Sequence, residues 1–419
     1  MHGNAEIDCL HGEQFIDLTS WYKNADMIQD FHVSPDGEKI AAIIHKDGQC
    51  GVHVNDNKWK GEYEKIWLLR FAPDGRLSAL VSESEEWTVA IDDKPWENRY
   101  DYIWNTMFSE DGKSVAVAFQ KEGDYGIAID DTPWKKTYTN IGNMVLSSDG
   151  KRSAASIQVK KLDEGDIHAF QKGAFTAAID GEPWDNIYVN TWNPAFSKDN
   201  RQLAVGVRIN LYDYTVVVNG HRWDRTFECI WKPLFNPVTG GVVAPVRINS
   251  KWTIAENGQI LWKNKFAQLW QPIYSPDGNK LAAIIAKSFG KWTIAVNDKI
   301  WKTKPGDKIT GMVFSRDSKR VAAVIMHKGK QTLVYDNKIC NLYFDRVWPP
   351  VFSPDSSHIA AKVELNGKYT ITLNGVLWKI FYDKVWDPVF SKDGASLIIR
   401  AIRGNVYSRH IVAVDKFSE

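Results

Sequence analysis

Residues 270–301, WQPIYSPDGNKLAAIIAKSFGKWTIAVNDKIW, are the stretch of sequence that decides the fold. Ser275-Pro276-Asp277-Gly278 is typical of a tight turn, because proline presets one turn dihedral and glycine accepts a positive φ. Two short apolar runs follow at 281–285 and 292–296, as expected for buried strands rich in β-branched residues. Asn297-Asp298 then predicts a tight hairpin. The stretch therefore predicts short antiparallel strands, with a fourth beginning at Trp301.

The same unit recurs along the whole chain of 419 residues. Each copy is anchored by the apolar residue before its turn, and the anchors are spaced 37 to 40 residues apart, with one interval of 50. The anchors are Val33, Phe71, Phe108, Leu146, Phe196, Phe235, Tyr274, Phe314, Phe352 and Phe390. Helical periodicity is absent, so the repeat is a unit of strands.

The 19 tryptophans occupy three positions of this repeat. The first series precedes the anchor by 12 residues, or by 13 at Trp301, and Cys340 replaces tryptophan in one copy. This series is Trp21, Trp59, Trp96, Trp134, Trp184, Trp223, Trp262, Trp301 and Trp378. The second series precedes the anchor by four residues and is Trp67, Trp104, Trp192, Trp231, Trp270, Trp348 and Trp386. The third position holds Trp87, Trp252 and Trp292.

Four short strands in about 40 residues, repeated many times, are the signature of a β-propeller. We expect an all-β fold, a single closed β-propeller of about ten four-stranded blades. This is more than the usual roughly 4–8 blades. Two smaller propellers of about five blades each are the alternative, with a break near residues 160–173 or 236–250.

The two chain ends predict how the ring closes. Phe15 to Leu18 and Trp21 match the third strand and the first-series tryptophan of a unit that has no preceding turn. The C-terminal copy ends before its own tryptophan strand. We therefore expect residues 1–12 to be a tail and 13–417 to be the propeller, closed by pairing 13–33 with 389–417. Such pairing removes both sheet edges.

We expect the tryptophans to stabilise the ring, because a blade of this size has little core of its own. A buried indole covers about 150–250 Å². The structural set is Trp59, Trp96, Trp134, Trp184, Trp223, Trp262, Trp301 and Trp378. Sugar binding by surface tryptophans, or passage of an electron hole along aligned indoles, are the functional alternatives.

Composition excludes several partners. With 52 Lys and Arg against 51 Asp and Glu, the chain has no basic block that would follow a phosphate backbone, so we expect no nucleic acid. The four cysteines form no CxxC pair and no haem-attachment motif. The start MHGNAEIDCL does not resemble a leader, and no apolar run predicts a direct membrane span.

No catalytic, cofactor or metal motif stands out. The histidines are scattered, and GxSxG, a phosphate loop and a dinucleotide fingerprint are all absent. Asp92-Asp93 and Asp130-Asp131 could be mistaken for calcium loops, but they occupy the hairpin position that Asn-Gly fills elsewhere. We expect no catalytic residue, no cofactor and no metal, although a catalytic triad assembled from distant blades remains open.

Two departures from the repeat are candidate partner contacts. The long fourth copy carries an insertion with Lys160, Lys161, Asp163, Glu164, Asp166 and His168. Insertions in repeat proteins map to one face, often the binding face, although a plain solvated loop is the simpler interpretation. Tryptophan is missing from the second position at Gln29, Gly142 and Thr310, where we expect looser blade boundaries. With Cys340, these gaps are further places to look for a partner.

Two resemblances add to this interpretation. Phe352-Ser353-Pro354-Asp355 followed by Ile359-Ala360-Ala361 resembles the repeat of TolB-type and tricorn-type propellers, and implies blades only. The units of the form KWTIAVND-xxW, as at 291–301, and the tryptophan content resemble the tryptophan-rich subunit (TmcD type) of the transmembrane redox complex of sulfate-reducing bacteria. That resemblance implies an accessory subunit without cofactors, beside a haem-b membrane subunit, an iron–sulfur subunit and a multihaem cytochrome c.

The function expected from these observations is a non-catalytic scaffold. It would dock on the cytoplasmic side of a membrane-bound electron-transfer complex, peripheral to the inner membrane through an iron–sulfur and a haem-b partner subunit. The alternative is an enzyme or ligand-binding propeller that uses its central channel for a small molecule or glycan.

Overall fold

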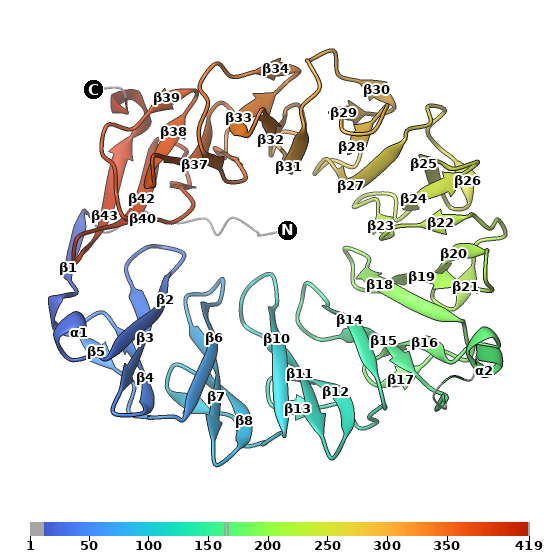
Figure 1. Ribbon diagram of the computed structural model, residues 1–419, viewed down its shortest axis with the longest axis horizontal. Helices are drawn as coiled ribbons and strands as arrows, with labels where there is room; N and C mark the ends of the chain where they lie inside the picture. The colour runs from blue at the N-terminus through green and yellow to red at the C-terminus, as the bar shows by residue number, and fades with distance from the viewer. Residues whose placement is uncertain (1–11, 163–164, 166, 418–419) are drawn as a thin grey trace.

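The chain folds into ten antiparallel sheets arranged as a closed ring (Figure 1). This computed structural model describes residues 12–162, 165 and 167–417. The prediction of one ten-bladed β-propeller is confirmed, and the alternative of two smaller propellers is wrong. In each blade the strands are lettered A to D from the centre of the ring outward, and the blades are numbered from the first complete one.

The first five blades each consist of four consecutive strands. Blade 1 contains β2 (Met27–Val33), β3 (Ile40–Lys46), β4 (Gln49–Val54) and β5 (Asn57–Lys58). Blade 2 contains β6 (Lys65–Phe71), β7 (Leu77–Glu83), β8 (Glu86–Ile91) and β9 (Lys94–Pro95). Blade 3 contains β10 (Tyr102–Phe108), β11 (Val115–Lys121), β12 (Asp124–Ile129) and β13 (Thr132–Pro133). Blade 4 contains β14 (Ile141–Leu146), β15 (Ser153–Gln158), β16 (Phe175–Ile179) and β17 (Glu182–Pro183). Blade 5 contains β18 (Asn190–Phe196), β19 (Leu203–Arg208), β20 (Tyr214–Val218) and β21 (His221–Arg222).

The next four blades follow the same order, but in two of them the A strand is split. Blade 6 contains β22 (Cys229–Ile230) and β23 (Leu234–Phe235), then β24 (Val242–Ile248), β25 (Lys251–Glu256) and β26 (Gln259–Ile260). Blade 7 contains β27 (Gln268–Tyr274), β28 (Leu281–Ala286), β29 (Trp292–Val296) and β30 (Lys299–Ile300). Blade 8 contains β31 (Lys308–Phe314), β32 (Val321–His327), β33 (Lys330–Tyr335) and β34 (Lys338–Ile339). Blade 9 contains β35 (Arg346–Val347) and β36 (Val351–Phe352), then β37 (Ile359–Leu365), β38 (Lys368–Leu373) and β39 (Val376–Leu377).

Blade 10 is assembled from both ends of the chain. Its A to C strands are β40 (Lys384–Val385) with β41 (Val389–Phe390), β42 (Ser396–Arg403) and β43 (Val406–Ala413). Its outer strand is β1 (Gln14–Asp17), which pairs with β43 in the register Gln14 to Arg409 and Asp17 to Val406. The sequence assignment of this segment to a third strand is wrong, because β1 is the fourth strand of the blade. Three short helices complete the described residues: α1 (Thr19–Lys23), α2 (Ile167–Gln171) and η1 (Val414–Lys416).

A second contact locks blade 10 to the first turn of blade 1. Arg409 is fully buried, and its Nε donates to the carbonyl oxygen of Asp36 at 2.7 Å. Arg400 Nη1 donates to the carbonyl oxygen of Ser34 at 3.0 Å, and the Tyr407 hydroxyl donates to that of Gly37 at 2.5 Å. Gly37 has a φ of 76°, and a Cβ there would come within 2.8 Å of Arg400 Cδ. Position 37 therefore requires glycine, because its φ is positive and because a side chain there would clash with the buried arginines.

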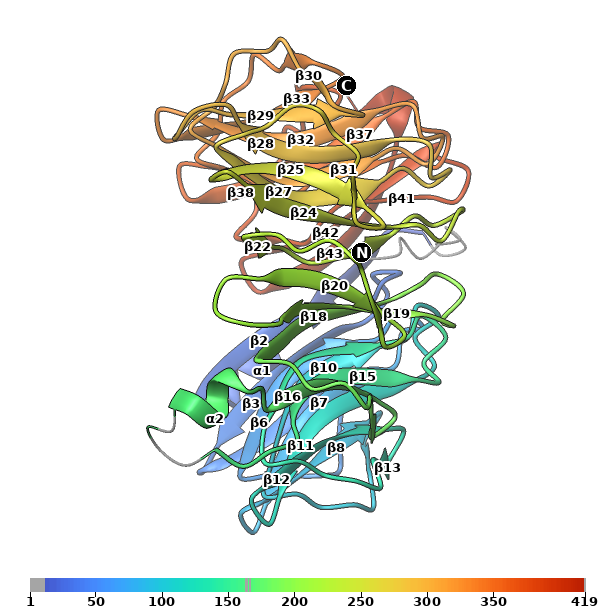
Figure 2. The same ribbon diagram turned by 90° about the vertical axis from the view of Figure 1, so that its right-hand side faces the viewer.

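The order of strands gives the ring two different faces. The turns between A and B strands and the hairpins between C and D strands lie on one side, which we call the lower face. The B–C turns and the starts of the A strands lie on the other, the upper face. Figure 2 shows the ring from its side, with α2 projecting from one edge.

Among residues 12–162 and 167–417, the large buried apolar clusters lie between blades. Each neighbouring pair of blades shares a cluster of buried residues, including the pair that joins blade 10 to blade 1. The cluster between blades 1 and 2, for example, contains Val52 and Trp59 from the first and Leu69 and Leu77 from the second. The boundaries near 160–173 and 236–250 are packed in the same way, so neither is a break between domains.

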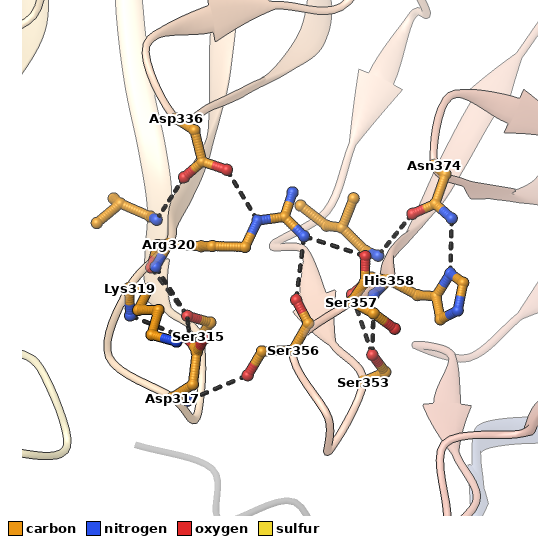
Figure 3. A network of polar contacts seen from close by, with 12 residues as sticks. Ser315, Asp317, Lys319, Arg320, Asp336, Ser353, Ser356, Ser357, His358 and Asn374 are labelled. Atoms are coloured by element: carbon orange, nitrogen blue, oxygen red, sulfur yellow. Dashed lines mark hydrogen bonds and ion pairs between the residues drawn. The ribbon is translucent and has the colours of Figure 1, made fainter.

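The lower face carries a repeated polar network, drawn for blades 8 and 9 in Figure 3. Within the turn, Ser315 Oγ donates to Asp317 Oδ1 at 2.6 Å and accepts the Arg320 N–H at 2.9 Å. Between blades, Arg320 Nη1 donates to the carbonyl oxygens of Ser356 and Ser357, each at 3.1 Å. These contacts hold each turn and tie it to the next blade.

The turn hydroxyls hold the pKa of several turn aspartates below the usual range. The pKa is lowered in Asp111, Asp149, Asp199, Asp277, Asp317, Asp355 and Asp393, and in Asp277 and Asp355 it falls to about 2. The first cause in every case is the hydrogen bond from the turn serine, such as Ser275 to Asp277.

These shifts predict how stability depends on pH. Because the folded pKa is lowered, the stabilisation is present above the unfolded pKa of about 4 and is lost as pH falls toward about 2. We expect Ser275→Ala to lower the melting temperature at pH 7, and the difference from wild type to shrink between pH 4 and 2. Ser288→Ala, in an exposed B–C turn, is the control. A difference that stays constant with pH would contradict this role of Asp277.

Candidate protein-interaction face

The first-series tryptophans lie in the cores between blades. Trp59, Trp96, Trp134, Trp223 and Trp262 are buried, and Trp262 is only 2% exposed. The other three of the structural set, Trp184, Trp301 and Trp378, are half-buried. Some indoles also find an acceptor, as Trp134 Nε1 donates to Ser153 Oγ at 2.8 Å. The position that Cys340 fills is likewise packed, against the cluster between blades 8 and 9.

The second-series tryptophans are less buried, and three of the seven are exposed. Trp67 is 41% exposed, Trp231 45% and Trp270 38%. Trp67 and Trp270 sit in A strands next to a bulge, and the residue that follows each, Leu68 or Gln271, has a positive φ. Trp231 lies between β22 and β23, where the A strand of blade 6 is split. The bulge turns the side chain out of the regular pleat.

Each second-series tryptophan packs on the aromatic residue of the third position in its own blade. Where that residue is tryptophan, the rings overlap with small or moderate interplanar angles. The centroid distances are 4.5 Å for Trp67–Trp87, 5.2 Å for Trp231–Trp252 and 4.2 Å for Trp270–Trp292. Where it is tyrosine, the pair is edge-on. These pairs are Trp104–Tyr125, Trp192–Tyr214, Trp348–Tyr369 and Trp386–Tyr407.

The stacked pairs keep one indole buried and hold the other at the surface. Trp252 and Trp292 are 5% and 8% exposed, whereas their partners Trp231 and Trp270 are the exposed members. Both positions lie close to the B–C turn, so the exposed indole is at the upper end of the blade. A buried ring thus fixes a large apolar ring at the surface, which lowers the entropy that ring would lose on binding.

Further aromatic and apolar side chains extend this surface. In blades 2 and 3, Tyr102 lies 6.0 Å from Trp67 and 5.9 Å from Trp104, which makes a continuous aromatic run. The B–C turns add Tyr212, 79% exposed, and Phe289, 87% exposed. Exposed aromatic residues are enriched at the centres of protein interfaces. The upper face therefore carries the side chains that protein interfaces use.

The insertion between β15 and β16 lies on the same face. Lys160, Lys161 and His168 are exposed, as is Ile167 at the start of α2. Asp163, Glu164 and Asp166 fall outside the described residues. The insertion thus adds basic and apolar side chains to the rim of the upper face at blade 4.

The three second positions without tryptophan differ from one another. At Gly142 an added Cβ would meet nothing within 4 Å, so space is left open. In blade 8, where Thr310 stands, the third-position residue Gln331 accepts the Val347 N–H at 2.8 Å. In blade 1 a polar chain replaces the aromatic pair: Cys50 Sγ lies 3.3 Å from His45 Nδ1, and His45 Nε2 lies 3.0 Å from Gln29 Oε1.

This Cys–His–Gln chain has the geometry of an activated nucleophile but not its environment. Cys50 is 4% exposed, and burial raises the pKa of its thiol. A catalytic cysteine needs a lowered pKa, because the thiolate is the nucleophile. The sequence pattern does not reveal this contact, although Gln29 is one of the gaps in the repeat. We assign these three side chains a packing role at the upper end of blade 1.

The hairpin aspartates are turn formers that also join blades. Asp92 and Asp93 both have positive φ, as the tight hairpin requires. Asp92 Oδ1 accepts the Leu77 N–H at 2.9 Å, and Asp93 Oδ2 accepts the Lys60 N–H of the previous blade at 2.7 Å. Within the described part of the chain, no group of three or more His, Cys, Asp or Glu residues could hold a metal ion.

Two shallow cavities lie between blades. One of about 390 Å³ is lined by charged residues such as Lys60, Glu83 and Arg99 at blades 1 and 2, and the other, of about 220 Å³, lies at blades 3 and 4 beside Lys161. No helix among the described residues is long and apolar enough to cross a membrane.

Comparisons with known proteins support the fold alone. No protein-family model and no curated protein matches the chain. Among solved structures, 613 chains are similar, so the fold does not distinguish between functions. A structure described as "the eukaryotic initiation factor" has a TM-score of 0.50 at 13% identity, covering 82% of this chain and 96% of that one. The Cps50 (Swd1) β-propeller domain of Myceliophteria thermophila has a TM-score of 0.32 at 12% identity, covering 65% and 98%.

The division between buried and exposed tryptophans predicts two sizes of mutational effect. Trp262→Ala removes a buried indole and should cost about 3–5 kcal/mol of unfolding free energy. Trp270→Ala removes one stacked, exposed ring and should cost about 1 kcal/mol. Urea denaturation followed by circular dichroism compares the two. Equal losses would show that both positions belong to the core.

Proposed function

We propose that this protein is a non-catalytic scaffold whose upper face binds protein. The observation that carries the proposal is the set of exposed tryptophans, Trp67, Trp231 and Trp270, each held at the surface by a buried indole beneath it. On the lower face, by contrast, polar side chains form hydrogen bonds within and between blades, as in the Ser315–Arg320 network.

The exposed tryptophans have the features of binding hot spots. A large ring that is already fixed loses little side-chain entropy on binding, and tryptophan is enriched among residues that dominate interface energies. Their spread over blades 2, 6 and 7 suits a broad partner surface better than a small ligand, which needs an enclosed pocket.

The identity of the partners is a finer proposal, supported by the tryptophan-rich repeat and its resemblance to the redox-complex subunit. We propose that the scaffold belongs to a membrane-bound electron-transfer complex, on its cytoplasmic side, with an iron–sulfur and a haem-b subunit as partners. The scaffold itself would supply no cofactor.

The test is purification of the tagged full-length chain from its own organism, with the variant Trp67→Ala/Trp231→Ala/Trp270→Ala beside it. We expect wild type to bring down stoichiometric partner proteins, identified by mass spectrometry, and the triple variant to lose them while remaining folded. The matched control is Val238→Ala/Ile260→Ala/Val376→Ala, which removes exposed apolar side chains away from the upper face.

Wild type that purifies with no partner, or a triple variant that keeps its partners, would contradict the scaffold proposal. Partners without haem or iron–sulfur clusters would contradict the electron-transfer assignment and leave the scaffold role standing.

A further inference from the structure

The upper face carries its charges in two separate arcs. Blades 2 and 3 present mostly exposed carboxylates, against the cations Lys65 and Lys121. The carboxylates are Glu64, Glu83, Glu85, Glu86, Asp101 and Glu122. Blades 7 to 9 present mostly exposed cations, which are Lys287, Lys291, Lys308, Lys328, Lys330 and Arg346. One face of a nearly neutral chain is therefore strongly polarised.

Three acidic groups lie inside the basic arc: Asp307 and Asp345, which are engaged by their neighbours, and Glu364, which is opposite Arg346 in the register of β35 and β37. Asp307 Oδ2 accepts the Lys328 N–H at 2.7 Å, and Asp345 pairs with Lys330 Nζ and accepts the Asn366 N–H at 2.7 Å. These carboxylates order the B–C turns. The exposed cations around them, Lys308, Lys328 and Arg346, remain directed to the surface of the arc.

The two arcs lie on opposite sides of the ring. In Figure 1 blades 2 and 3 are at the bottom, and blades 7 to 9 run from the upper right to the upper left. A two-fold axis in the plane of the face, passing between blades 10 and 1 and between blades 5 and 6, relates the two sides. It would place blade 2 of one copy on blade 9 of the other, and blade 3 on blade 8. Each acidic blade then meets a basic one, twice by symmetry.

The same axis also brings exposed apolar residues together. It places blade 5, whose Tyr212 is 79% exposed, on blade 6, whose Trp231 is 45% exposed. It places blade 4 on blade 7, so Ile167, 65% exposed, faces Phe289, 87% exposed.

We infer that a second copy of this chain occupies the upper face, so that two rings associate face to face as a symmetric dimer. The inference rests on the proposed function, since it names the occupant of the proposed binding face. Self-complementary charge and apolar patterns are the requirement of an isologous interface, and opposed charges also select the register. Other subunits would then bind at the perimeter of the double ring, where the upper faces of both copies meet, so their binding would depend on the dimer.

A charge swap tests the arrangement directly. Variant A is Glu85→Lys/Glu122→Lys, in blades 2 and 3, and variant B is Arg346→Glu/Lys328→Glu, in blades 9 and 8. Sedimentation equilibrium of the purified full-length chain at low salt should show a dimer for wild type. A alone and B alone should dissociate at least about tenfold more readily, because like charges then face each other. An equimolar mixture of A and B should recover the dimer, because every contact between A and B is again opposite in sign.

Higher salt should weaken the wild-type dimer, since exposed charges are screened. A control that changes net charge equally with two exposed carboxylates of the lower face, Asp56→Lys/Glu110→Lys, should leave the dimer unchanged. Wild type that stays monomeric at about 100 μM, or a mixture of A and B that stays monomeric while wild type dimerises, would overturn the inference.

The outcomes separate this inference from the proposed function. A monomeric chain whose tryptophan variant still loses partner subunits overturns the dimer and leaves the scaffold role. A dimer that brings down no other protein supports the dimer and overturns the scaffold role.

Discussion

The closure of the ring at blade 10 is the contact on which the rest of the structure depends. Four residues of β1 complete the blade, and Ile16 is buried in the cluster between blades 10 and 1. Arg409 and Tyr407 bind the backbone of the first turn from the same blade. Because every core lies between two blades, an open ring would expose two apolar faces at once. Closure converts a row of marginal repeats into one folded body.

The closing contact explains an unusual pair of buried cations. The two cations are Arg400 and Arg409. Burial lowers the pKa of Arg400, and both guanidinium groups donate to backbone carbonyls of the first turn. A buried charge is costly unless hydrogen bonds compensate for the loss of water. Only an arrangement that supplies those bonds is stable, so the buried arginines specify one geometry. Here the specified geometry is the joint between the two ends of the chain.

Much of the fold could be predicted from the sequence, because strand length, turn chemistry and repeat spacing are local signals. The Ser-Pro-Asp-Gly turns and the Asn-Gly-type hairpins predicted the blades, and the incomplete ends predicted a shared one. The exposure of Trp67, Trp231 and Trp270 could not be predicted. It depends on a bulge or a break in the A strand, and neither is marked by a particular residue type. The contact from Asp93 to the previous blade and the Cys50–His45–Gln29 chain depend on neighbours brought together by folding.

The same indole therefore has two uses in this ring. In the first position it fills the boundary between blades, as Trp262 does, and in the third position it supports a ring above it, as Trp292 does for Trp270. Trp67, Trp231 and Trp270 in the second position are exposed, and we propose that they bind a partner.

The most direct test of this account compares two substitutions in β1 by backbone hydrogen exchange. Ile16→Asp changes a side chain that is 7% exposed, and Phe15→Asp changes its neighbour that is 61% exposed. If the ring depends on its closure, Ile16→Asp will accelerate exchange in every blade, including blades 5 and 6 across the ring, and Phe15→Asp will not. Faster exchange confined to blades 10 and 1 in the Ile16→Asp variant would contradict the account.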